Sequence, residues 1–225
     1  MENIANECLL IELHTKFSDN IMKSLEDENK HQALEFRAKQ FALLGQIIKE
    51  DTLDTTHLEL YPIFDEVSSD CILSLYLASC SLDKPAQIIL RRALELGIAL
   101  VYLWDLPCTF WGWKSHDVDL NFNEMINYLT HDSYNTYIKS INPNLGNALF
   151  NSTDARVLYR ELSNTTHGKI TTFETNLPHR FSYNTTDWKS HLNDVRRVED
   201  IIHDIWWTRF SEYIPEFRSR TQQLI

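Results

Sequence analysis

Arg160 and His167 are the two residues whose types and spacing are best suited to chemistry. If the helix predicted over residues 154–167 is unbroken, the seven-residue step completes almost two turns. The two side chains then project within about 20° of each other on one face. An imidazole takes up or releases a proton near neutral pH, and a guanidinium stabilises charge on phosphoryl oxygens. The pair therefore suits cleavage of an RNA phosphodiester, in which histidine exchanges a proton with the ribose 2′-hydroxyl or the leaving oxygen.

Both residues also have an ordinary structural interpretation. His167 can cap the C-terminus of this helix, where a positive charge is favoured and Gly168 ends the helix. Arg160 can pair with a carboxylate, and two such residues occur at this spacing often by chance. Residues 163–166 (Ser-Asn-Thr-Thr) are poor helix formers, so we expect an irregular last turn. The spacing alone leaves both interpretations open.

Arg91 and Glu95 form a second candidate pair, in the tract IILRRALELGIALVYLWD at residues 88–105. They lie one turn apart on a flank of the apolar stripe of a predicted helix. As a surface ion pair they would add little stability, because arginine before glutamate is the weaker order. Alternatively, Glu95 holds Arg91 so that its guanidinium faces a cleft.

The segment over 105–117 is predicted to be a loop by its Pro, Gly and Asp residues. Four aromatic residues lie in it or directly before it: Trp104, Phe110, Trp111 and Trp113. We expect them to anchor this loop to the core, and a surface for a partner is the alternative. Trp206 and Trp207 point to two faces of the last predicted helix. One ring should be buried, and the other is free to meet a second subunit.

No motif in the chain predicts a metal or a cofactor. The nine histidines show no H-x-x-x-H or H-E-x-x-H spacing, and the four cysteines show no C-x-x-C. Neither of the common glycine-rich nucleotide-binding loops is present. We therefore predict chemistry that uses only the side chains of the protein.

The elements that must position these residues are predicted to be helices. Five glycines and six prolines are too few for the many turns of an all-β protein. Apolar residues recur with helical spacing, which predicts an all-α, up-and-down antiparallel bundle of six to seven helices. The predicted helices cover residues ~3–24, ~27–50, ~56–81, ~84–105, ~118–141, ~154–167 and ~187–213. We expect N-caps at residues 54–56, at Ser81 or Asp83, and at residues 152–154. Only residues 168–186 are rich enough in Thr, Phe and Tyr to be extended.

The 225 residues show no internal repeat or linker, so we predict a single domain over 1–225. The formal net charge of −11 argues against a general nucleic-acid coat. Residues 1–150 hold 11 basic and 22 acidic residues, whereas residues 151–225 hold 10 of each. If any surface approaches phosphate, we expect it in the C-terminal third.

Cellular location is predicted from three features. No run approaches the ~18 apolar residues of a membrane span. The N-terminal tract carries three glutamates and no basic segment, unlike a signal peptide. The four cysteines are widely spaced, and three of them lie in apolar helical patterns typical of free buried thiols. We therefore expect a cytoplasmic protein without membrane contact.

The tract at 88–105 and the tract LYRELSNTTHGK at 158–169 together resemble the helical HEPN superfamily. The resemblance covers residues ~70–170 well and the remainder only in helix content. The signature of this family is Arg-(x)4–6-His, and Arg160 and His167 match it with six intervening residues. The resemblance implies a HEPN-like core over about 55–213, with the N-terminal helices of residues 1–50 packed on it. It also implies that Arg160 and His167 are catalytic.

The resemblance is closest to prokaryotic branches of unassigned function. Many ribonuclease members of the family act without metal as homodimers, with two Arg–His pairs brought together across a two-fold axis. Many are toxins or antiviral effectors, and others have lost activity and serve as interaction modules. Residues expected to contact the substrate are Tyr159, Ser163, Asn164 and Lys169, with Arg91 and Glu95 from the facing helix.

Two functions follow as alternatives. The first is a metal-independent endoribonuclease of a bacterial defence or toxin–antitoxin system, active on RNA as a homodimer. The second is a non-catalytic helical module that binds an antitoxin or a partner effector protein. Glu161 favours the second, because ribonuclease members often have Asn, Asp or His after the motif arginine and a carboxylate repels phosphate.

Overall fold

The structure is a computed structural model that describes residues 9–26, 30–52, 54–143, 149–169 and 181–222. All regular structure in these ranges is helical, which confirms the all-α prediction. The α-helices are α1 (Leu9–Glu26), α2 (Lys30–Asp51), α3 (Thr55–Leu60), α4 (Pro62–Ser79), α5 (Asp83–Asp105), α6 (Pro107–Lys114), α7 (Phe122–Leu129), α8 (Asp132–Ile141), α9 (Ser152–Thr166), α10 (Thr185–Arg209) and α11 (Ile214–Gln222).

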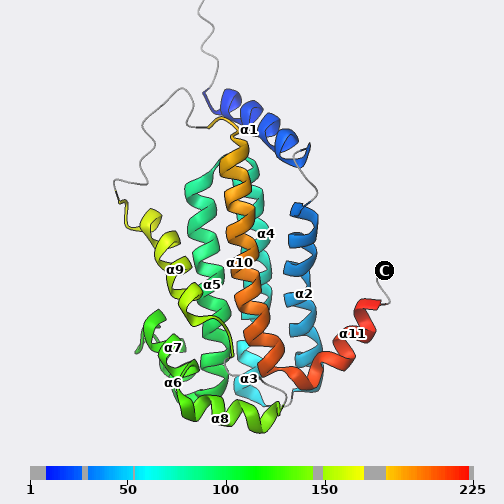
Figure 1. Cartoon of the computed structure of the whole chain (residues 1–225), viewed down its shortest axis with the longest axis vertical. Helices are drawn as coiled ribbons and strands as arrows, with labels where there is room; N and C mark the ends of the chain where they lie inside the picture. Colours follow the sequence, from blue (N-terminus) through cyan, green and yellow to red (C-terminus); the bar gives the residue numbers. More distant parts are fainter. Residues whose placement is uncertain (1–8, 27–29, 53, 144–148, 170–180, 223–225) are drawn as a thin grey trace, which may run out of the picture.

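The long helices α2, α4, α5 and α10 form the centre of the bundle, and α9 covers one side of α5 and α10 (Figure 1). Their buried apolar side chains form one contiguous core. Trp206 of α10 is fully buried, with its ring centroid 5.1 Å from that of Phe41 and 4.8 Å from that of Phe64. The expectation that one of the two adjacent tryptophans is buried is therefore confirmed.

Helix directions differ from a strict up-and-down order. Consecutive helices α4 and α5 are antiparallel, because residues 80–82 turn the chain sharply between them. In contrast, α5 and α10 run parallel, and an ion pair of 2.8 Å joins Asp105 and Arg209 near their C-terminal ends. The physical reason is that α10 packs beside helices that do not immediately precede it in the sequence, so no short turn sets its direction.

Helix boundaries also differ from those predicted, mainly at prolines. The helix expected over 56–81 is divided at Tyr61, and Pro62 begins α4. The loop expected over 105–117 is wrong, because Pro107 begins α6 instead of breaking the chain. Proline is favoured at the first helical position, where its missing N–H would have no partner. The helix expected over 118–141 is divided into α7 and α8, and α11 was not predicted.

Three N-caps were predicted, and one of them is confirmed. The Asp54 side chain accepts a hydrogen bond of 3.0 Å from the N–H of His57 and caps α3. Neither Ser81 nor Asp83 caps α5, whose N-cap is Leu82 and has no side-chain hydrogen bond. Residues 170–180 of the stretch expected to be extended, and residues 3–8 of the first expected helix, lie outside the described residues.

The aromatic side chains in and next to α6 differ in their exposure to solvent. Trp104 and Phe110 are buried, as expected for side chains that anchor this segment to the core. Trp111 is exposed, and the Nζ of Lys114 lies 4.8 Å from the centre of its ring. The prediction for these aromatic residues therefore holds for Trp104 and Phe110 and not for Trp111. Trp113 is half-buried and packs against the core.

Helix α5 has no side chain at Gly97, where α10 approaches closely. An added Cβ would lie 2.6 Å from Cγ1 and 2.7 Å from Cδ1 of Ile202, closer than real atoms come. The carbonyl oxygen of Gly97 accepts a hydrogen bond of 2.8 Å from the indole nitrogen of Trp206. A side chain here would force the two helices apart.

We expect Gly97→Ala to lower the free energy of unfolding by about 1–3 kcal/mol, the usual effect of overpacking a core. Chemical denaturation measures this loss. In a chain that already carries Ile202→Ala the clash is absent, so Gly97→Ala should then have little effect. Equal losses of stability with and without Ile202→Ala would show that the clash with Ile202 is not the cause of the destabilisation.

Candidate functional site

Helix α9 carries the predicted catalytic pair. Its N-cap is Asn151, whose side chain accepts a hydrogen bond of 3.0 Å from the N–H of Asp154. The cap expected within residues 152–154 is therefore one residue too late. Leu158 and Leu162 are buried against the core, so the opposite side of the helix faces solvent.

The last turn of α9 is regular, contrary to the expectation from residues 163–166. The N–H of His167 donates to the carbonyl of Ser163 (3.0 Å), and the N–H of Lys169 donates to the carbonyl of Asn164 (3.1 Å). Gly168 has a φ of 58°. This is the pattern of a helix closed by a glycine in the left-handed conformation. The helix is thus unbroken from Arg160 to Thr166, with His167 as its C-cap.

Arg160 and His167 are both exposed. Within the described residues, neither side chain has a hydrogen-bond or ion-pair partner. The regular helix between them satisfies the condition under which a seven-residue step returns to the same face. Along the helix axis their Cα atoms are separated by about 10 Å at 1.5 Å per residue. A phosphodiester group together with its adjacent nucleotides spans a comparable length. Both side chains can therefore reach the same nucleic-acid strand.

Glu161 is turned away from this pair. Its carboxylate lies 3.0 Å from the guanidinium of Arg197 on α10, which also pairs with Asp154 at 2.5 Å. These hydrogen bonds raise the pKa of Arg197 above its usual value, so its charge is constant. The carboxylate that follows the motif arginine is therefore compensated by a cation, which reduces its repulsion of phosphate.

Arg156 extends the positive charge of α9 and was not identified from the sequence. It donates to the side-chain oxygens of Asn123 (2.7 Å) and Asn127 (2.8 Å) on α7. Both partners are neutral amides, so its charge is not cancelled. The signal in the sequence was its position four residues before Arg160, one helical turn away.

Arg91 joins α5 to α9. Its Nε donates to the Ser163 hydroxyl (3.0 Å), its Nη2 donates to the Tyr159 hydroxyl, and the Glu95 carboxylate lies 3.6 Å away. The guanidinium carbon is 4.7 Å from the centre of the Tyr159 ring, which stacks on Phe122 with centroids 3.7 Å apart. Four residues predicted to contact substrate thus meet, and their polar groups bind one another.

The two remaining candidates lie at the end of α9. Asn164 is half-buried in the last turn, and Lys169 is exposed directly after the helix. On the α5 side of this turn, the Thr165 hydroxyl donates to the side-chain oxygen of Gln87. This contact and the Arg91 contacts fix α9 against α5, so the exposed side chains extend from a rigid helix.

Ser74 and His191 form a buried pair of the residue types that make up the catalytic dyad of some hydrolases. The Ser74 hydroxyl donates to the carbonyl of Ala86 (2.9 Å), so the Nε2 of His191, 2.9 Å away, must donate to the Ser74 oxygen. Burial lowers the pKa of His191 to about 4. A histidine that donates to the serine cannot remove its proton, so this pair is structural.

Among the described residues, no group of three or more His, Cys, Asp or Glu side chains is placed to hold a metal ion. None of the described helices combines the length and the hydrophobicity that crossing a membrane requires. Comparisons with protein-family models, with curated proteins and with solved structures find no significant match to this chain.

Proposed function

We propose that this protein is a metal-independent, HEPN-like endoribonuclease of a bacterial defence or toxin–antitoxin system, with its active site on the exposed face of α9. The observation that carries this proposal is that Arg160 and His167 are exposed and, within the described residues, free of protein partners on a regular helix. Both side chains are therefore open to a substrate, as the proposal requires. The Glu161–Arg197 ion pair supports it, because it turns the neighbouring carboxylate toward α10.

In the proposed reaction, neutral His167 removes the proton of a ribose 2′-hydroxyl. The 2′-oxygen attacks phosphorus, the bond to the 5′-oxygen breaks, and a protonated imidazole or water returns a proton to that oxygen. The products are a 2′,3′-cyclic phosphate and a 5′-hydroxyl. Arg160 stabilises the negative charge on the phosphoryl oxygens, and Arg156 binds an adjacent phosphate.

Tyr159, Ser163, Arg91 and Glu95 act in this proposal as positioning residues. Their mutual contacts hold α9 on α5 and leave few polar groups for substrate. Asn164 and Lys169, at the end of the helix, are the remaining candidates to contact RNA. A homodimer would place a second His167 where it can protonate the leaving oxygen.

The test is cleavage of single-stranded RNA by the purified chain in the presence of EDTA. We expect wild type to cleave, and His167→Ala and Arg160→Ala each to lose at least about 100-fold in rate. His116→Asn is the matched control, because His116 is exposed at the end of α6 and should be dispensable. Cleavage by His167→Ala at the wild-type rate, or no cleavage by wild type, would exclude the proposal.

A second function is favoured by a different observation. Helix α1 exposes large apolar side chains, including Ile11 and Met22, which a monomer without partners rarely does. We therefore also propose a non-catalytic module that binds a partner effector or antitoxin. A stoichiometric complex with one protein encoded beside it, without RNA cleavage, would select this function over the first.

A further inference from the structure

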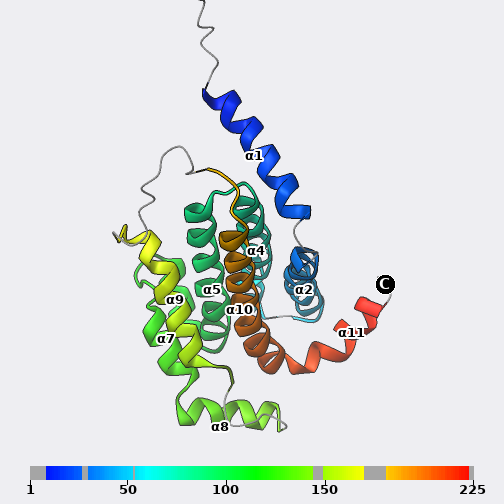
Figure 2. The same ribbon diagram turned by 45° about the horizontal axis from the view of Figure 1, so that its top comes forward.

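Arg156 of α9 and two asparagines of α7 form a cluster of polar side chains at the surface, called here the Arg156 cluster. The Nη1 of Arg156 donates to the Oδ1 of Asn123 (2.7 Å), and its Nη2 donates to the Oδ1 of Asn127 (2.8 Å). Both asparagines are exposed and lie one helical turn apart on α7, and Arg156 is half-buried. Figure 2 shows α7 beside α9 at one side of the bundle.

The two helices are fixed to each other next to this cluster. Phe122, the first residue of α7, is buried and stacks on Tyr159 of α9, with ring centroids 3.7 Å apart. The side chain of Asn121 caps α7 by accepting from the N–H groups of Asn123 (2.9 Å) and Glu124 (3.3 Å). The cluster is therefore held in place before any ligand binds, which lowers the entropic cost of binding.

The Arg156 cluster presents mainly hydrogen-bond donors to solvent. A guanidinium has five N–H groups, so three remain after the two contacts with the asparagines. The amide oxygens of Asn123 and Asn127 face Arg156, and their NH2 groups donate to none of the described residues. The one carboxylate of α7, Glu124, lies about 60–100° around the helix from these amides. Because the non-bridging oxygens of a phosphodiester only accept, the cluster is complementary to that group.

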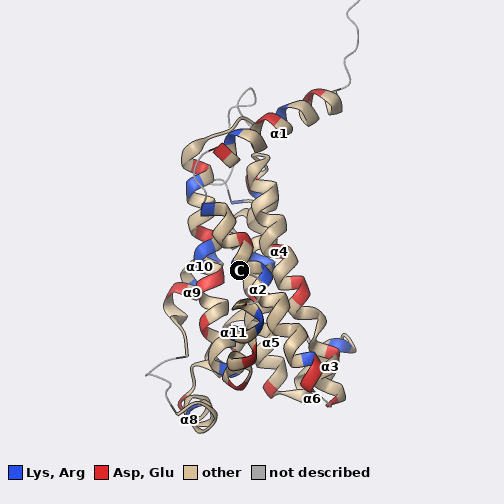
Figure 3. Ribbon diagram, turned by 90° about the vertical axis from the view of Figure 1, so that its right-hand side faces the viewer, with Lys and Arg blue, Asp and Glu red and all other residues tan. Residues whose placement is uncertain are grey.

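The charges of α9 are separated between two sides of the helix. Basic and acidic residues are interspersed along most helices of the bundle (Figure 3). On α9, however, both carboxylates, Asp154 and Glu161, pair with Arg197 of α10 (2.5 Å and 3.0 Å). The two arginines of α9, Arg156 and Arg160, pair with no carboxylate among the described residues. The exposed side of α9 next to α7 is therefore positively charged.

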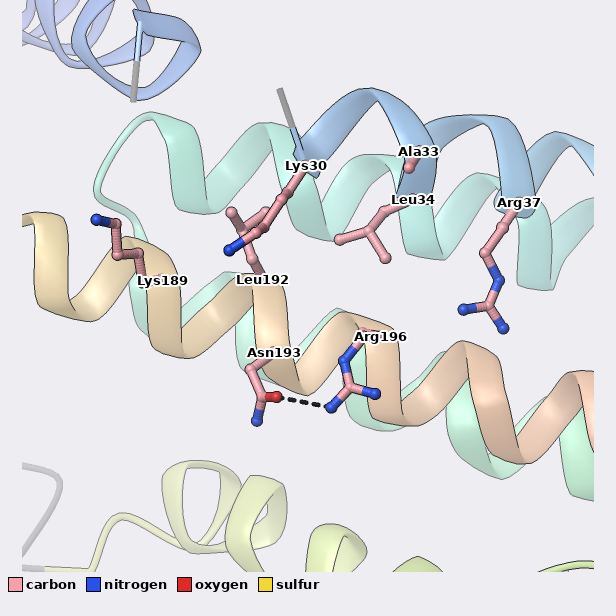
Figure 4. A pocket seen from close by; sticks show the side chains of 8 residues that line it. All are labelled: Lys30, Ala33, Leu34, Arg37, Lys189, Leu192, Asn193 and Arg196. Atoms are coloured by element: carbon pink, nitrogen blue, oxygen red, sulfur yellow. Dashed lines mark hydrogen bonds between the residues drawn. The ribbon is translucent and has the colours of Figure 1, made fainter. Parts of the chain in front are cut away.

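An arginine–asparagine contact on α10 shows what distinguishes the Arg156 cluster. The Nη2 of Arg196 donates to the Oδ1 of Asn193 (3.0 Å), as the dashed line in Figure 4 shows. The same guanidinium also pairs with the carboxylate of Asp200 (3.1 Å). The positive charge of Arg196 is therefore compensated, whereas that of Arg156 is not. The α10 contact is a matched comparison with the same residue types and without the excess charge.

Arg156 lies in the same row as the proposed catalytic pair. Arg160 follows it by four residues and His167 by eleven, so the three side chains project within about 40° of one another on α9. Arg156 and Arg160 are separated by about 6 Å along the helix axis. A strand that contacts Arg160 and His167 can therefore continue along α9 to the Arg156 cluster.

We propose that Arg156, Asn123 and Asn127 form a subsite that binds a phosphodiester of the RNA substrate next to the one that is cleaved. The choice of RNA as the ligand rests on the proposed ribonuclease function, and the subsite adds two residues of a second helix to its binding surface. A strand of several nucleotides reaches the subsite. A dinucleoside monophosphate does not, because its single phosphodiester is the one that is cleaved.

The first test measures binding and requires no cleavage. Its probe is a short single-stranded 2′-O-methyl RNA of mixed sequence, which has no free 2′-hydroxyl and cannot be cleaved by the proposed reaction. Fluorescence anisotropy with the full chain at several salt concentrations gives the Kd and its salt dependence. We expect Arg156→Gln to increase the Kd at least about fivefold. It should also reduce the slope of log K against log salt by about 0.7, the value of one phosphate contact on a single strand.

The asparagines are tested by variants that leave Arg156 in place. Asn123→Ala/Asn127→Ala removes both amides and no charge, so the Kd should increase at least about threefold with an unchanged salt slope. Asn123→Asp keeps an acceptor for Arg156 and suits the first turn of α7, where an acidic residue is favourable. Its carboxylate would repel phosphate, so the Kd should increase at least about tenfold. Circular dichroism checks that each variant folds.

The matched controls are Arg196→Gln and Asn193→Ala on α10, which should bind the probe like wild type. A cleavage assay then compares a longer single-stranded RNA with a dinucleoside monophosphate. In the variants of the Arg156 cluster, we expect kcat/KM to fall by a larger factor for the longer RNA, mainly through KM.

The two assays separate the subsite from the proposed function. Binding of the probe that depends on the Arg156 cluster, without cleavage of RNA, would support the subsite and exclude the ribonuclease. Three results would overturn the subsite, even if RNA is cleaved. They are wild-type affinity in all variants of the Arg156 cluster, equal losses in the α10 controls, and no binding of the probe by wild type.

Discussion

Glu199→Gln is expected to flatten the pH dependence of stability between about pH 5 and pH 8. Glu199 of α10 is 0% exposed, and neither oxygen of its carboxyl group has a hydrogen-bond partner among the described residues. The nearest cation is Arg37 of α2, 3.7 Å away, and Asp200 and Cys71 are the other titratable neighbours. Burial raises the pKa of Glu199 to about 8.

The sign of the effect follows from the two pKa values. In the unfolded chain Glu199 has a pKa of 4.5 and loses its proton above it, whereas the folded chain keeps the proton until about pH 8. Between these values the unfolded chain binds fewer protons, so stability falls as pH rises. The slope is about 1.4 kcal/mol per pH unit, and the loss over the window is on the order of 3–5 kcal/mol. Glutamine does not titrate, so this loss disappears.

Urea denaturation of wild type and Glu199→Gln at pH 5, 6, 7 and 8 measures this difference. The two chains should have similar stability at pH 5, and the variant should be more stable by about 3 kcal/mol at pH 8. Asp200→Asn is the control, because that carboxylate is adjacent but partly exposed. Parallel pH profiles of wild type and Glu199→Gln would contradict the assignment. The carboxyl group of Asp70, whose pKa burial raises to about 6, titrates equally in both chains.

The burial of Glu199 shows how far periodicity alone can predict a core. Val195 and Ile202 define the buried side of α10, and Glu199 is four residues after the first and three before the second. Its position in the helix therefore favours burial, although its chemical type favours exposure. Here helix geometry determines the environment, and the protein accommodates the carboxyl group by keeping it protonated.

Proline was the main source of error in the fold. Both Pro62 and Pro107 begin a helix, whereas the sequence pattern predicts Pro62 within a longer helix and Pro107 in a loop. Proline can end one helix or begin the next. Only the packing of the apolar residues that follow it determines which of the two occurs. In α6 this packing is provided by Phe110, which is buried in the core.

The candidate site could be predicted only where it depends on a single helix. The spacing of Arg160 and His167 is a property of α9 itself, and the helix is indeed unbroken between them. The partners of Arg91 and Glu161 depend on how α5 and α10 pack against α9. Glu161 and Arg197 are 36 residues apart, and no local pattern links them. The irregular end expected for α9 was wrong, because Gly168 closes it with backbone hydrogen bonds that helix propensity does not include.

Arg209→Met is expected to lower the free energy of unfolding by about 3–5 kcal/mol. Arg209 of α10 donates to the Asp105 carboxylate through Nε (3.0 Å) and Nη2 (2.8 Å), and Tyr134 of α8 donates to the same carboxylate (2.7 Å). The side chains of Arg209 and Asp105 are only 10% and 4% exposed. Without the guanidinium, the buried carboxylate is left with one neutral donor, and an uncompensated buried charge carries a penalty of this size.

Replacing both members of the pair separates the value of the ion pair from the penalty of an unpaired charge. In Asp105→Leu/Arg209→Met no charge of the pair remains buried, and only the Tyr134 hydroxyl loses its acceptor, at a cost of about 1 kcal/mol. Urea denaturation should therefore show the double variant to be more stable than Arg209→Met, with a coupling energy of about 2–3 kcal/mol in the double-mutant cycle. If the two single losses simply add, the pair contributes no more than an exposed ion pair, and the parallel packing of α5 and α10 depends on their buried apolar side chains instead.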